Sequence, residues 1–160
     1  MKLVDGRGAS LTLEIAGYQF TSADQSVNST CITVDDCNWI MVNGMVVPPP
    51  PGKCWEFTDP CLNTVELKNL ADWFGKISAS PIPRTISFME PNLRLSFLPL
   101  PKPVDKVSLY HECASPWNRR TFPGYDELHF PSDCNDLAQI SHELHDLASR
   151  FPPRIKGGRT

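Results

Sequence analysis

The 160-residue chain has no long hydrophobic run. Its longest uninterrupted apolar stretch is far shorter than the ~18 residues that a membrane-spanning helix needs. The first ten residues, MKLVDGRGAS, contain no apolar segment of signal-peptide length. We therefore expect a cytoplasmic protein that makes no direct use of a membrane.

The sequence also lacks the short motifs that accompany common enzyme chemistries. Its nine glycines are scattered, so they form neither a phosphate-binding loop nor a dinucleotide fingerprint. A G-x-S-x-G segment, which would place a serine nucleophile, is missing. The six cysteines include no C-x-x-C pair, and their spacing matches no zinc framework. We expect no cofactor, no bound metal and no catalytic residues.

The cysteines themselves favour a reduced state. Without an export signal, and in a chain well above the size of disulfide-stabilised mini-proteins, six cysteines do not indicate a disulfide scaffold. We expect free thiols that are mostly buried and that pack as small hydrophobic side chains.

One segment, Ser141 to Asp146 (SHELHD), invites comparison with a zinc protease helix. Such a helix carries its two histidines at positions i and i+4, so that both reach one metal. Here His142 and His145 are three residues apart, while Leu144 falls on the predicted core side of the helix. We interpret Glu143 and Asp146 as part of a solvated helix face.

Hydrophobic periodicity predicts two helices. In residues 63–77, apolar side chains recur at the i, i+3, i+4, i+7 spacing of one buried face, and Asn63 with Glu66 forms a capping-box pattern. A second apolar stripe predicts a helix over residues 133–151, which the Pro152-Pro153 pair ends.

Alternating apolar and polar residues predict about seven strands. They lie around residues 11–20, 39–47, 54–57, 86–88, 93–97, 107–109 and 128–130. The phase of the first strand changes near Ala16-Gly17, which predicts a bulge there. Residues 39–47 are apolar at successive positions, so we expect a strand covered on both faces. Pro91-Asn92 suits a type II turn.

The order of these elements has no βαβ alternation. It predicts an α+β fold, with a largely antiparallel sheet of about seven strands and two packed helices. Sixteen prolines cluster in loops, without a long disordered tract that would separate domains. We expect one domain over residues 1–154 and a basic, disordered tail over residues 155–160.

The charge is distributed unevenly along the chain. Of 15 basic and 18 acidic residues, four basic and no acidic ones lie in residues 150–160, so residues 1–149 carry 11 basic and 18 acidic groups and a net charge of −7. An acidic body favours a basic protein partner and disfavours direct nucleic-acid binding.

Candidate partner-binding residues follow from composition. Trp117 lies in a proline-containing loop beside Arg119 and Arg120, the composition of an interface hot spot. The best acidic surface candidates are Asp24, the Asp35-Asp36 pair, and Asp126-Glu127 after Tyr125. Solvated turn residues are the alternative reading of these acids.

Five short strings occur in an order and spacing that resemble the WapI-type bacterial immunity proteins. They are GYQF at 17–20 before NW at 38–39, WEFTDPCL at 55–62, VEL at 65–67 leading to WF at 73–74, SFMEPNL at 87–93, and FPPR at 151–154. Their aromatic, turn and cap residues suggest a structural role. The Pro48–Pro51 loop is longer and richer in proline than the resemblance leads us to expect.

The resemblance implies a protein that neutralises a cognate toxin domain, of a polymorphic or contact-dependent system, by stoichiometric binding. Because such proteins resemble antidotes to nuclease-type toxins, the acidic body would face a basic nucleic-acid cleft. Two alternatives stay open. One is a small metal-dependent hydrolase using His111, His142, Glu143 or His145, and the other is a protein-binding module without a toxin.

Overall fold

The structure is a computed structural model, and it describes residues 1–5, 8–20, 36–47, 54–82, 84–89, 93–98, 106–111, 126–131 and 134–154. These residues form two four-stranded sheets, a short 3-10 helix and two α-helices. Sheet A contains β1 (Lys2–Val4), β2 (Ser10–Tyr18), β3 (Trp39–Val47) and β4 (Trp55–Asn63), and sheet B contains β5 (Arg84–Ser87), β6 (Leu93–Leu98), β7 (Lys106–His111) and β8 (Asp126–Pro131). The helices are η1 (Asp36–Asn38), α2 (Thr64–Ala79) and α3 (Leu137–Arg150).

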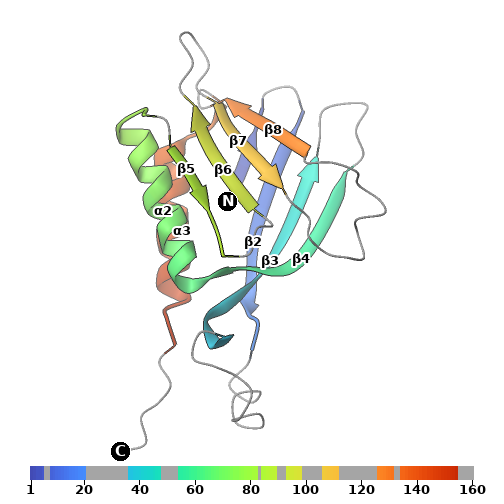
Figure 1. Cartoon of the computed structure of the whole chain (residues 1–160), viewed down its shortest axis with the longest axis vertical. Helices are drawn as coiled ribbons and strands as arrows, with labels where there is room; N and C mark the ends of the chain where they lie inside the picture. Colours follow the sequence, from blue (N-terminus) through green and yellow to red (C-terminus); the bar gives the residue numbers. More distant parts are fainter. Residues whose placement is uncertain are drawn as a thin grey trace, which may run out of the picture.

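The two sheets lie one in front of the other, and the two α-helices run side by side along one flank (Figure 1). Each sheet keeps its strands in chain order, and every pairing in the described strands is antiparallel. Strand β1 also contacts β8, so the sheets approach each other along these edges. The buried core draws on both sheets and both helices, and its large members include Leu11, Ile40, Phe97, Phe130, Leu70, Phe74 and Leu144.

The α+β class, the two helices and the antiparallel pairing confirm the sequence prediction. The single sheet of about seven strands is not confirmed, because eight strands divide into two sheets. Strand β1 was missed, since three residues are too few to show an alternating pattern. Its backbone is held by a side chain: Asn135 Nδ2 donates to the Val4 carbonyl oxygen at 2.8 Å, and Asn135 Oδ1 accepts from the Val4 amide at 2.9 Å.

Strand β2 contains the predicted bulge. Its pairing with β3 shifts between Ile15 and Gly17, and Gly17 has a φ of 153°. Glycine adopts this backbone conformation without the steric cost that a Cβ atom brings. The extra residue explains why the apolar positions change face before Tyr18.

Strand β3 lies between β2 and β4, but only one of its faces is buried. Ile40, Val42 and Val46 point into the core, whereas Asn43 and Met45 are exposed on the opposite face. The prediction of a strand covered on both faces is therefore wrong. The prediction counted Met45 as buried because it is apolar, but apolar residues are also common on protein surfaces.

Helix α2 begins as predicted. Asn63 Oδ1 accepts a hydrogen bond from the Glu66 amide at 2.9 Å, and Glu66 Oε2 accepts one from the Asn63 amide at 3.0 Å, which completes a capping box. The side chain of Ser141 in α3 donates to the Ala71 carbonyl oxygen at 2.8 Å, and Gly75 lies directly beside this serine. Small residues thus bring the two helices close together.

Helix α3 begins four residues later than predicted, at Leu137 rather than 133. Asp136 is its N-cap, and its Oδ1 accepts a hydrogen bond from the Gln139 amide at 2.9 Å. Several residues before the helix can cap it equally well, so sequence alone does not select among them.

The cysteine prediction needs correction. Cys37 and Cys54 are free, but Cys37 is half-buried and Cys54 exposed, and Cys134 is also exposed. Of the four described cysteines only Cys61, in β4, is buried. Cys31, Cys113 and the predicted Pro91-Asn92 turn lie outside the described residues. In the part of the chain that the structure covers, neither α-helix has the length and apolar character of a membrane span.

Candidate functional site

A shallow hollow of about 330 Å³ lies over sheet A and is lined by residues of β2, β3 and β4. Two cross-strand rows of side chains build it. Thr12, Met45 and Glu56 pair across the three strands, and the next row contains Glu14, Asn43 and Thr58. Side chains two residues apart on a strand share a face, so both rows lie on the same side of the sheet.

This face is the outer one, because the core residues of β2 and β3 occupy the alternate positions. Glu14 and Glu56 are exposed, Met45 is 41% exposed, and Thr58 Oγ1 donates to Asn43 Oδ1 at 2.9 Å. Among the described residues, the lining of the hollow includes two acids and no base, and the exposed Lys2 of β1 pairs with Thr12 at its edge. We call this surface, made by Thr12, Glu14, Asn43, Met45, Glu56 and Thr58, the acidic face.

A glycine lies directly against an aromatic ring on the inner side of the acidic face. The ring of Phe57 in β4 lies against the α-carbon of Gly44, its register partner in β3, where a Cβ atom would overlap the ring. Gly44 therefore allows a phenylalanine to occupy the inner side of the sheet beneath the two rows.

Beside the acidic face, burial raises the pKa of the Asp59 carboxyl above its ordinary value of 3.8. Asp59 is half-buried in β4 and pairs with the buried Val42. Desolvation disfavours the charged form of a carboxyl group, so burial shifts the pKa of Asp59 upward.

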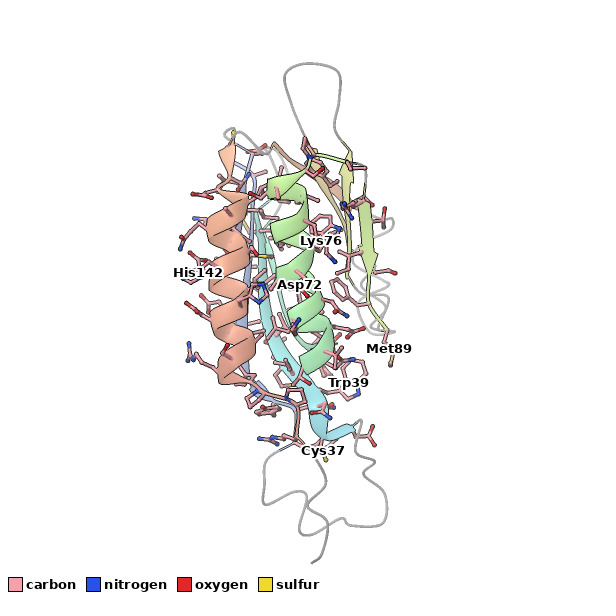
Figure 2. All side chains as sticks on the ribbon, turned by 90° about the vertical axis from the view of Figure 1, so that its left-hand side faces the viewer. Cys37, Trp39, Asp72, Lys76, Met89 and His142 are labelled. Carbon is pink, nitrogen blue, oxygen red and sulfur yellow. The ribbon has the colours of Figure 1, made fainter. Side chains whose placement is uncertain are left out.

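A second hollow, of about 320 Å³, lies between α2 and β5. Its lining consists of Asn69, Asp72, Trp73 and Lys76 from α2 together with residues 84–86 of β5. Two of the lining residues hold a buried donor, Trp73 Nε1 and Arg84 Nε, that has no hydrogen-bond partner among the described residues. Figure 2 shows Asp72 and Lys76 on neighbouring turns of α2. We call this hollow the α2–β5 pocket.

Exposed apolar side chains gather at the N-terminal end of α2. Met89 is 73% exposed and Val65 is 55% exposed, and the Met89 amide donates to Glu66 Oε1 at 2.5 Å. Figure 2 shows Met89, Trp39 and Cys37 at the same end of the molecule.

Most of the predicted partner-binding residues lie outside the described residues: Asp24, Asp35, Trp117 and Tyr125. Asp36 is half-buried and opens η1, just before β3. The backbones of Asp126 and Glu127 pair with His111 and Tyr110 at the start of β8, and their side chains are not described. Figure 1 shows the start of β3 and strand β8 at opposite ends of the molecule.

The two histidines of α3 point to different surroundings. His145 Nε2 lies 3.3 Å from Asp72 Oδ1 on α2, whereas His142 Nε2 lies 3.8 Å from Asp146 Oδ2 on its own helix. Glu143 and Asp146 are exposed and Leu144 is buried, which confirms the predicted solvated face. Among the described residues, no three histidine, cysteine or carboxylate side chains converge as metal ligands would.

The strings that suggested a family meet at one end of the molecule. Tyr18 Oη donates to the Pro152 carbonyl oxygen at 2.6 Å, and the Arg154 amide donates to Asn38 Oδ1 at 2.6 Å. Arg154 Nη1 donates to the Phe20 carbonyl oxygen at 2.6 Å. We call Tyr18, Asn38 and Arg154 the C-terminal clasp. It ties the last described residues to the end of β2 and the start of β3.

Two of the remaining strings, those at 65–67 and 87–93, meet at the start of α2, beside the same region. Thr64 Oγ1 donates to Asn38 Oδ1 at 3.5 Å, and Glu66 bridges the α2 N-terminus to Met89. The strings thus supply caps, strand ends and connections between segments, which confirms their structural role. The acidic face and the α2–β5 pocket were missed, because each combines residues that are distant in the chain and belong to no motif.

Comparison with known families agrees with this arrangement. Residues 2–152 match a family described as the Immunity protein WapI-like family. No curated protein matches the chain.

Proposed function

The chain belongs to the WapI-like immunity protein family, and from this membership we propose that it binds a cognate toxin domain stoichiometrically and blocks the toxin's active site. In this proposal the toxin is a nuclease delivered by a polymorphic or contact-dependent system. The protein acts as a partner and not as a catalyst. It works in the cytoplasm, where such a toxin reaches nucleic acid.

The observation that carries the proposal is the acidic face on sheet A. A nuclease must attract a polyanion, so the cleft around its active site is basic. Glu14 and Glu56 project from neighbouring rows of a three-strand surface, and the described residues that line the hollow between them include no lysine or arginine. Such a surface is electrostatically complementary to a basic cleft.

Rigidity is the second property that an inhibitor surface needs. The acidic face is built on three paired strands rather than on loops. A surface that is already ordered loses little conformational entropy when it binds. Met45, exposed between the two glutamates, adds an adaptable apolar contact at the centre of the charged surface.

Charge complementarity mainly accelerates association, and buried apolar contacts mainly slow dissociation. We therefore expect fast, salt-sensitive association with the toxin. We expect a standard-size interface of about 1,600 Å² and a Kd of roughly 1 nM or lower. Asp24, Asp35, Asp36, Trp117, Tyr125, Asp126 and Glu127 remain proposed contributors to this interface.

The test is co-expression with the C-terminal domain of the large protein encoded beside this chain. Growth rescue together with a 1:1 complex would support immunity by direct binding. A domain that is lethal alone and remains lethal, without forming a complex, would overturn the proposal. Rescue without a complex would overturn the stoichiometric mechanism alone.

A further inference from the structure

We propose that the α2–β5 pocket is a binding site for a carboxylate group, recognised by the indole N–H of Trp73 and the guanidinium of Arg84. The pocket lies apart from the acidic face and is built from a helix and the first residues of sheet B. This inference does not depend on the identity of the toxin.

The two unpaired donors carry the inference. Trp73 lines the pocket and is 6% exposed, and its buried Nε1–H has no acceptor within the described part of the chain. Arg84 Nε is likewise buried without an acceptor in that part. Buried polar groups are nearly always hydrogen-bonded in native proteins, and leaving one unpaired is costly. Two residues that line one hollow thus each hold a covered donor without an acceptor, which indicates that an acceptor from outside binds there once the side chains covering the donors shift.

The chemistry of the lining selects an anion. The indole N–H and the guanidinium can only donate, so the ligand must accept from both. Lys76 adds a second positive charge to the same pocket. A carboxylate accepts several hydrogen bonds and fits the planar fork of an arginine.

The one acid in the lining is already engaged by residues outside the pocket. Lys68 Nζ lies 3.1 Å from Asp72 Oδ2, and His145 Nε2 lies 3.3 Å from Asp72 Oδ1. The two oxygens of Asp72 are thus paired with Lys68 and His145, neither of which lines the pocket. The remaining charge of Asp72 still disfavours a dianion, which argues for a carboxylate over a phosphate.

The volume is that of a small ligand or of one inserted side chain. About 320 Å³ is at the lower end of the range for small-molecule sites. The carboxylate can come from an acidic side chain of a bound protein or from a small free carboxylic acid. Either ligand would accept hydrogen bonds from the same donors. The two differ in how tightly the carboxylate binds when it is offered as a small molecule.

The experiment follows the Trp73 indole N–H by ¹⁵N–¹H NMR of the full chain, with Trp73→Phe used to assign the resonance. Acetate, N-acetylglutamate N-methylamide, glutarate, acetamide and inorganic phosphate are titrated at constant ionic strength. We expect saturable movement of the Trp73 resonance with the carboxylates and not with acetamide or phosphate. Indole resonances of the other three tryptophans serve as internal controls.

Variants define the second donor. Arg84→Lys retains the charge but removes the planar fork, so we expect carboxylate affinity to fall about tenfold. Arg150→Gln removes an exposed positive charge on α3 and should leave the affinity unchanged. Unaltered circular dichroism of each variant confirms that it is folded.

Comparing the ligands distinguishes a carboxylate carried by a protein from a free carboxylic acid. Comparable millimolar affinity for acetate and for the glutamate side-chain mimic supports a protein-borne carboxylate, and at least tenfold tighter binding of glutarate supports a free acid. Equal movement with acetamide would overturn the carboxylate assignment in favour of a neutral acceptor. Three outcomes would overturn the proposal. They are movement of the Trp73 resonance with phosphate alone, no movement with any ligand tested, and binding of the carboxylates by Arg84→Lys as tightly as by the unaltered protein.

Discussion

The guanidinium carbon of Arg154 lies 3.4 Å from the centroid of the Tyr18 ring. The tyrosine ring also meets Phe151 edge to face, at a centroid distance of 5.5 Å. Residues separated by more than 130 positions thus form one small cluster at the base of the molecule. The last described segment is therefore part of the folded body, which agrees with the family match over residues 2–152.

Arg154→Gln tests the C-terminal clasp. It removes the cation–π contact and the hydrogen bond to the Phe20 carbonyl oxygen. We expect the free energy of unfolding to fall by about 1–2 kcal/mol, measured by chemical denaturation. Arg150→Gln, at an exposed position on α3, is the matched control and should change it by less than about 0.5 kcal/mol. Equal effects of the two variants would contradict the clasp.

Glu66→Ala tests the junction at the start of α2. The carboxylate accepts from the Asn63 amide and from the Met89 amide, so the variant loses a capping box and a link to the segment after β5. We expect a loss of roughly 1–3 kcal/mol in the free energy of unfolding. The control Glu143→Ala removes an exposed carboxylate that accepts from the exposed Gln139 side chain, and it should be near neutral. An effect of Glu66→Ala no larger than this control would show that the junction is not stabilising.

Gly44→Ala tests the close approach of β3 to the Phe57 ring. The added methyl group would occupy the position of the ring, so the sheet must shift or the phenylalanine must leave its site. Overpacking of this kind costs about 1–3 kcal/mol. We expect a lower melting temperature that is partly restored in the Gly44→Ala/Phe57→Leu double variant, because leucine is smaller and more flexible. Additive losses in the double variant would argue against a direct clash.

Asp59 makes a pH-dependent contribution to stability. Burial raises its pKa above 3.8 in the folded protein, so the folded state holds this proton more tightly than the unfolded chain does. The contribution of Asp59 to stability is therefore favourable at low pH. It is lost as pH rises from 3.8, the ordinary pKa, through the higher pKa of the folded state. Asp59→Asn should gain stability relative to the native chain over that interval and keep the gain at neutral pH.

Urea denaturation at several pH values measures this difference. Glu56→Gln, an exposed change on the same strand, is the control and should show no comparable gain. A destabilisation of Asp59→Asn that is the same at every pH would show that the contacts of Asp59, and not its burial, dominate.

The helices were predictable because their signals are local. The capping box at Asn63 and Glu66 spans four residues, and the apolar stripe of α2 repeats every three or four residues. The bulge at Gly17 was predictable for the same reason, since a change of phase is visible within one strand. Division of the strands into two sheets was not predictable, because it depends on which distant strands pair.

The candidate surfaces depend on distant pairing as well. Glu14 and Glu56 are 42 positions apart, and only the register of β2, β3 and β4 places them on one face. The periodicity of residues 63–77 predicts a buried helix face, but it says nothing about whether the N–H of the buried Trp73 finds an acceptor. Asp36, in contrast, was chosen for its charge, and in the structure it is half-buried within η1.

Charge reversal on the acidic face tests its role in toxin binding. If the face meets the basic cleft of a nuclease, Glu14→Lys/Glu56→Lys should slow association by roughly tenfold at low salt and flatten the salt dependence. Stopped-flow or surface-based kinetics with the purified toxin domain measures both. The Asp35→Lys/Asp36→Lys variant tests the sequence-predicted site in the same assay.

The control must separate local complementarity from overall charge. Glu143→Lys/Asp146→Lys makes the same change in net charge on the exposed face of α3, remote from sheet A in sequence and on another layer of the fold. If all three double variants slow association equally, net charge alone steers the encounter and neither site is the interface. If only the Asp35/Asp36 variant slows it, the interface lies near η1, and sheet A is excluded. A selective effect of the Glu14/Glu56 variant would locate the toxin on the acidic face, because the matched control carries the same charge.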